Sequence, residues 1–193
     1  MERQMCVAIR SVRLVAALAA STLVLSGWLS PAWGASGKEI DADVDKALVQ
    51  FEKEVKNGKS FLDSSKGVLV FPNVLKAGLA VGGEYGEGAL RIGGKTVDYY
   101  NTAAASFGLQ AGGQIKTVII AFLDADALQR FRESKGWKAG VDGSIAVVTL
   151  GAGGAIDTTK LKDPIVGFAV DQKGLMANLT FEGSKFTKLD KKS

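Results

Sequence analysis

The chain has 193 residues, with 24 Lys and Arg against 20 Asp and Glu, a single Cys and no His. The absence of His excludes an imidazole-based catalytic triad, and a single Cys permits neither an internal disulfide nor a thiolate metal cluster. We therefore expect no metal site and no cofactor. With 47% hydrophobic and 23% charged residues, the composition is typical of one globular domain. The 24 Gly, which follow no three-residue repeat, predict tight turns and crowded strands.

Residues 1–34 have the pattern of a cleaved secretory signal peptide. A positively charged start leads into an apolar run over 12–25, which is shorter than the roughly 20 residues that a membrane span needs. Small residues follow, and Ala32 and Gly34 at positions −3 and −1 predict cleavage before Ala35. We therefore expect a periplasmic or extracellular protein, with a retained membrane anchor as the alternative.

The segment just before the predicted cleavage site also bears on lipid anchoring. Leu25-Ser26-Gly27 resembles the start of a bacterial lipoprotein processing box, but Trp28 stands where the acylated Cys would be, so no lipoprotein is expected. Loss of residues 1–34 removes three Arg and one Glu, and the net charge falls from +4 to +2. That small charge gives no support to a nucleic-acid partner. The remaining chain, 35–193, is predicted to be a single domain, peripheral on the membrane if it associates with one.

Two helices are predicted at the start of this domain. Apolar residues recur at helical spacing over 39–57, and Gly58 stands where a C-terminal cap belongs. A second, short helix is predicted over 60–66, capped by Ser60. The polar face of the first helix is rich in acids, which anionic lipid would repel, so its apolar stripe is interpreted as core packing rather than membrane insertion.

The remaining elements are mainly strands. Gly93-Gly94 predicts a two-residue hairpin turn. Asp124 is expected to cap a helix that runs to Ser134, with Ala127, Leu128 and Phe131 on its inner face. The lysine-rich tail from Lys185 is expected to be a solvated chain end. Strands are predicted over 68–71, 78–85, 88–92, 95–100, 104–112, 114–122, 144–150, 165–171 and 175–181. This order predicts an α+β fold, with N-terminal helices, one internal helix and a strongly bent, mainly antiparallel, glycine-rich sheet.

The sequence carries little that indicates catalysis. The cluster from Gly82 to Gly88 lacks the spacing of a phosphate-binding loop, and its two Glu would repel phosphate, so we interpret its glycines as turns or strand kinks. No Gly-x-Ser-x-Gly motif is present. An enzyme that works through carboxylates and lysines would need a deep polar cleft. We expect a protein that is not an enzyme and has no catalytic residues.

One group of basic residues is a candidate binding surface. Arg130, Arg132, Lys135 and Lys138 gather around Trp137 at the end of the internal helix and in the loop that follows. Cationic side chains beside an indole are typical of proteins that bind lipid headgroups. The alternative is a solvated helix end whose Trp137 packs into the core.

A longer pattern resembles the SYLF domain, and the resemblance extends over about residues 40–190. It rests on Ser65-Lys66-Gly67-Val68-Leu69-Val70-Phe71-Pro72-Asn73-Val74-Leu75-Lys76-Ala77-Gly78, on 81–88, on Phe107-Gly108, on 112–115, on 140–142, on 174–177 and on 181–184. It implies a structural role for the motif residues Gly82, Gly83, Tyr85, Gly86 and Gly88.

The resemblance also implies lipid binding. Eukaryotic SYLF proteins bind phosphoinositides and act with actin at membranes. Actin and cytosolic phosphoinositides are not expected partners of an exported chain. We therefore expect an exported, non-enzymatic module of the bacterial cell envelope that binds anionic phospholipid. The alternative is a structural or protein-interaction module of the envelope, with an envelope protein as its partner and no direct lipid binding.

Overall fold

The computed structural model describes residues 34–148, 155–156, 161–171, 174–175 and 180–192. The chain divides into two compact units, Met1–Gly34 and Ala35–Ser193. The predicted signal peptide, with Trp28, lies outside the described residues except for Gly34. Among the described helices, none has the length and apolar character needed to cross a bilayer.

Two helices open the second unit. α2 (Gly37–Glu54) begins at a capping box in which Ser36 and Glu39 bond each other's backbone N–H, and α3 (Gly58–Ser64) follows. Both helices differ in extent from the sequence prediction. Asn57, rather than Gly58, takes the left-handed conformation (φ 61°) that separates them, and Ser60 is not the cap. The Asn57 side chain bonds the backbone of Ile156, which holds it in this strained geometry.

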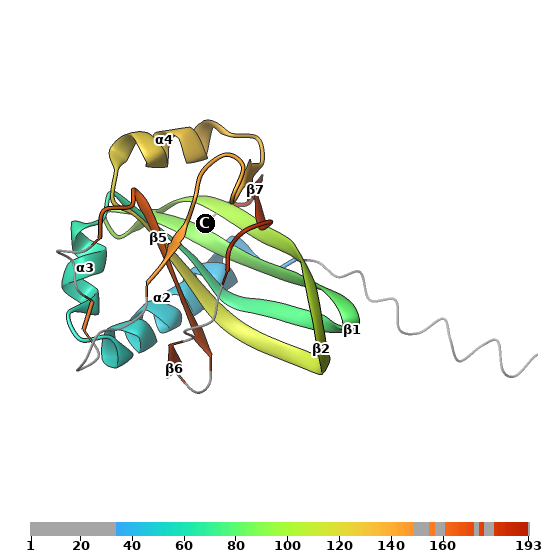
Figure 1. Cartoon of the computed structure of the whole chain (residues 1–193). Helices are drawn as coiled ribbons and strands as arrows, with labels where there is room; N and C mark the ends of the chain where they lie inside the picture. The colour runs from blue at the N-terminus through green and yellow to red at the C-terminus, as the bar shows by residue number, and fades with distance from the viewer. Residues whose placement is uncertain (1–33, 149–154, 157–160, 172–173, 176–179, 193) are drawn as a thin grey trace, which may run out of the picture. The chain divides into compact units, whose positions relative to one another are not determined.

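Two long strands form the centre of the fold (Figure 1). β1 (Gly67–Ile92) and β2 (Lys95–Phe122) pair antiparallel along their whole length and replace the six short strands expected here. The predicted Gly93-Gly94 turn between them is confirmed, with φ of 57° and 78°, values that favour glycine. The predicted break at 72–77 contains an irregularity in pairing, between Phe71 and Val74, whereas the pairing continues without a shift across 86–87 and 101–103. Glycine in these strands therefore does not end them.

The β1–β2 ribbon folds back on itself at Gly78, whose φ is +154° and where the pairing register shifts. The two halves of β1 then approach each other so closely that a Cβ on the second half would strike backbone or side chain of the first. A Cβ added to Gly82 would lie 2.3 Å from the Ala77 carbonyl oxygen, one on Gly86 would lie 2.9 Å from a Val74 methyl group, and one on Gly88 would lie 2.0 Å from the Val70 carbonyl oxygen. The ribbon is therefore strongly bent, as predicted, and glycine permits the contact between its two layers.

Short strands complete a seven-stranded sheet of order β3–β7–β2–β5–β4, with β1 also on β2 and β6 on β5. Between the described strands all pairings are antiparallel except that of β4 with β5, so the prediction of an α+β fold with a mainly antiparallel sheet is confirmed. The remaining elements are α4 (Ala125–Glu133), β3 (Trp137–Lys138), β4 (Ala146–Val147), β5 (Ile165–Asp171), β6 (Gly174–Leu175) and β7 (Lys185–Leu189). The last predicted strand is described only at its first residue, Leu175, and at 180–181, where no strand forms; 176–179 lie outside the described residues.

The helices cover opposite faces of the sheet (Figure 1). Alternate strand residues divide between two apolar clusters, with Val70 beneath α2 and Leu69 on the side of α4. The first cluster centres on Phe168, against which Phe51 and Phe61 pack edge to face. The second contains the carboxyl-terminal strand, because the ring of Phe186 in β7 is 2% exposed. The predicted solvated tail is thus wrong: it is a strand of the sheet.

Candidate functional site

The internal helix presents part of the predicted basic group to solvent. α4 begins after Asp124, whose carboxylate accepts a 2.8 Å hydrogen bond from the Ala127 N–H, as predicted for an N-cap. Its inner residues, Phe131 among them, are buried, as the sequence predicted. Helical geometry therefore directs Arg130 and Arg132 outward, and both are exposed.

Trp137 is not at the surface. Its side chain is 4% exposed and packs edge to face on Phe131, at a centroid distance of 5.7 Å, and against Phe186 at 5.8 Å. The structure therefore favours the core-packing alternative for this residue and removes the indole from any membrane contact in this conformation. The pairing of Trp137 with Phe186 explains its position, since both fall on the inward face of neighbouring strands.

The same pairing extends the basic group with residues that the sequence did not single out. Lys138 of β3 lies opposite Lys185 of β7, and both side chains are exposed. Lys188 lies on the other face of β7 and shares the Asp98 carboxylate with Arg132 of α4. We call the combined set the basic surface, and it consists of Arg130, Arg132, Lys135, Lys138, Lys185 and Lys188.

One carboxylate holds two of these cations. Asp98, with a side chain that is 9% exposed, binds Arg132 Nε at 3.1 Å and the Lys188 ammonium. Within the described chain, Arg130, Lys135, Lys138 and Lys185 form no ion pair, although the carboxylates of Glu133 and Asp142 lie on the same elements or loops. The basic surface therefore keeps an excess of positive charge.

A cavity opens beside these cations. Its volume is about 490 Å³, and its lining includes Leu128, Gln129, Arg132 and Lys188. In the core nearby, the hydroxyl of Tyr100 is buried without a hydrogen-bond partner in the described structure. Burial, and then the Asp98 carboxylate, raise the pKa of Tyr100 to about 12, against the opposing effect of Arg132.

The glycine motif has a structural explanation in this fold. Gly82, Gly86 and Gly88 face the other half of the ribbon, where a side chain would not fit, whereas a Cβ on Gly83 would make only ordinary contact. Tyr85 is half-exposed and donates a 3.0 Å hydrogen bond to Glu87. Burial and this carboxylate raise the Tyr85 pKa.

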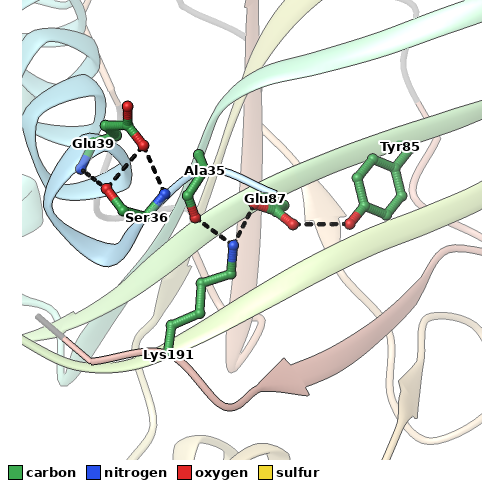
Figure 2. A network of polar contacts seen from close by, with 6 residues as sticks. All are labelled: Ala35, Ser36, Glu39, Tyr85, Glu87 and Lys191. Carbon is green, nitrogen blue, oxygen red and sulfur yellow. Dashed lines mark hydrogen bonds and ion pairs between the residues drawn. The ribbon is translucent and has the colours of Figure 1, made fainter. Parts of the chain in front are cut away.

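The motif also lies where the two ends of the unit meet (Figure 2). Lys191 donates to Glu87 at 2.7 Å and to the carbonyl of Ala35. The backbone of Lys192 lies so close to Gly37 that a Cβ there would fall 2.2 Å from its carbonyl oxygen. Ala35, the residue that the predicted cleavage would leave first, is thus bonded to Lys191, two residues after the end of β7.

Nothing in the described part of the chain brings together three or more carboxylate, thiol or imidazole groups that could hold a metal ion. What the basic surface can do chemically is attract and hydrogen-bond anions, above all phosphate groups.

One family model matches the carboxyl-terminal part of the chain. Residues 103–192 match the family model Ysc84, described as "Las17-binding protein actin regulator". The match supports the SYLF resemblance over residues 103–192, just under half of the chain. The SYLF match begins inside β2 and includes α4, β3 and β7, so the whole basic surface falls within it. No curated protein matches the sequence.

Proposed function

We propose that this chain is an exported, non-enzymatic module that binds the anionic phospholipid surface of the bacterial cell envelope. The observation that carries the proposal is the basic surface, in which six exposed cations come from α4, β3, β7 and the α4–β3 loop, and four of them form no ion pair within the described residues. Each Lys or Arg held near an anionic membrane contributes about 1 kcal/mol of attraction. Export is supported by the pattern of residues 1–34.

Vesicle flotation tests this function. Residues 35–193, which form a compact unit, are mixed at low salt with vesicles of phosphatidylglycerol or of neutral phosphatidylcholine. We expect co-flotation with the anionic vesicles only, and a steep loss of binding as ionic strength rises. If the protein stays at the bottom of the gradient with anionic vesicles at low salt, the proposal is wrong.

Charge reversal locates the surface. The pair Lys135→Glu and Lys138→Glu should abolish flotation, because it inverts the centre of the basic surface. The matched control is Lys53→Glu with Lys56→Glu, which makes the same change of net charge at exposed positions at and just after the end of α2. Equal loss in both pairs would show that net charge alone, and not this surface, determines binding.

A structural or protein-interaction module remains the second candidate, and one observation favours it: Val81 and Ile115 are exposed apolar side chains on the long ribbon. Light scattering after size exclusion, with capture from an envelope extract, tests it. A monomer that captures no envelope protein would count against this candidate.

A further inference from the structure

At the bent end of the ribbon, charged side chains lie inside and apolar side chains lie outside, which is the reverse of the usual arrangement in a protein. We call residues 73–86 of β1 with 102–117 of β2 the ribbon tip. Between its two layers lies an ion pair in which Lys116, 7% exposed, binds Glu84 at 2.7 Å, and Lys76 approaches the same carboxylate at 3.6 Å. Charged groups inside a small two-layered structure are costly unless they are paired, as they are here.

Among the side chains that the structure describes, those on the outer faces of the ribbon tip are mainly apolar. In the first layer Leu75 and Ile115 are direct cross-strand neighbours and are 49% and 56% exposed. In the second layer Val81 and Tyr85 are 65% and 50% exposed. Strand alternation places these four side chains on the faces opposite to Glu84 and the glycines that touch the other layer.

Because the layers meet through their inner faces, the two apolar outer faces point away from each other. A protein partner with a flat surface would cover only one of them, whereas a lipid layer surrounds an inserted segment on all sides. The position of the basic surface agrees with a lipid. Ala103, exposed on the second layer, pairs with Lys185, which pairs in turn with Lys138. Cations therefore begin where the apolar tip ends, at the level that lipid phosphates would occupy.

We propose that the ribbon tip inserts between the lipids of an anionic bilayer, with the basic surface against the headgroups. The inference rests on the proposed function and adds the part of the fold that enters the apolar layer. The ion pair of Lys116 and Glu84 stays inside the tip, shielded by the outer apolar residues.

Depth-dependent fluorescence quenching tests the insertion. Residues 35–193 contain a single Trp, the buried Trp137, which sets a low baseline. Val81→Trp and Ile115→Trp report on the two outer faces, and Val49→Trp is the matched control, because Val49 is 51% exposed on α2. Vesicles of phosphatidylglycerol carry bromine on the acyl chains. Both tip indoles should be quenched and the α2 indole should not.

The outcomes separate the insertion from the proposed function. Flotation with anionic vesicles but no quenching at Val81→Trp and Ile115→Trp would overturn the insertion and leave headgroup binding intact. Neither flotation nor quenching would overturn both. Quenching of only one tip indole would indicate that a single face of the tip lies on the bilayer and would also refute insertion.

Charge in the tip provides an independent measurement. Val81→Asp and Ile115→Asp should each weaken binding to phosphatidylglycerol vesicles about tenfold, because a carboxylate resists transfer into the apolar layer. Val49→Asp should leave binding unchanged, and thermal melts should show that all three variants fold. A dimer in light scattering that Val81→Asp dissociates, combined with no quenching, would assign the tip to a second copy of the chain instead.

Discussion

Asp98→Asn separates stability from membrane attraction, because one carboxylate neutralises two cations of the basic surface. The carboxylate is 9% exposed, while Arg132 and Lys188 are 42% and 49% exposed. Pairs with cations this exposed contribute about 0.2–1 kcal/mol each. The substitution should therefore lower the free energy of unfolding by about 1 kcal/mol, which for a domain of this size lowers Tm by roughly 2–4 °C.

The same substitution should strengthen vesicle binding. Removal of one negative charge from the basic surface is equivalent to about 1 kcal/mol of added attraction to an anionic bilayer, or about fivefold in affinity at low salt. A urea titration and a flotation series measure the two effects on one protein. Asp63→Asn makes the same charge change at an exposed ion pair on α3 and should alter neither property appreciably. Unchanged or weaker vesicle binding by Asp98→Asn would refute the reasoning, since it would mean that these two cations do not face the membrane.

Three further predictions concern the fold. Gly88→Ala should destabilise the protein by about 3 kcal/mol or more in urea titrations, because its Cβ would lie 2.0 Å from the Val70 carbonyl oxygen. The control Gly83→Ala should stay within about 1 kcal/mol of wild type, and equal effects of the two substitutions would contradict the contact between the two layers. Tyr100→Phe should add about 1 kcal/mol of stability by removing an unpartnered hydroxyl. Because the folded state raises the Tyr100 pKa from 10.0 to about 12, the wild type should lose stability as pH rises from 10 through 12, and a variant with the same slope would disprove the assignment. Lys191→Met should speed amide exchange in the first residues of α2 without a change in vesicle binding, and unchanged exchange would show that the contact with Ala35 does not hold this end.

Short sequence patterns correctly predicted the features that depend only on neighbouring residues, such as a helix cap and a tight turn. Asp124 caps α4 because its carboxylate reaches an N–H three residues away, and Gly93-Gly94 turns the chain because both residues take positive φ. Such signals lie within a few residues of the feature they determine, so they can be recognised without the rest of the fold.

The basic surface could be predicted only in part. The sequence grouped Arg130 with Lys135 because they are close in the chain, but Lys185 joins them through a strand pairing that spans nearly fifty residues. The same pairing decides the place of Trp137, because Phe186 and Phe131 provide the apolar contacts that bury its ring. Neither the strand pairing of Lys185 nor the packing of Trp137 on Phe186 can be recognised from the periodicity of nearby residues.

The glycine cluster from Gly82 to Gly88 does not have the spacing of a phosphate-binding loop, but the structure shows that its spacing meets a packing requirement. Along β1 every second residue points to the same face, and from Gly82 onward the inward positions are Gly82, Glu84, Gly86 and Gly88. The face that meets the other half of the ribbon therefore carries one side chain, and that carboxylate has a lysine from β2 as its partner. The interior of the ribbon tip holds backbone, this ion pair and the buried side chain of Val74, while Leu75, Val81, Tyr85 and Ile115 point outward. The reversal of polarity that supports membrane insertion is thus a consequence of the same glycine spacing that lets the ribbon fold in half.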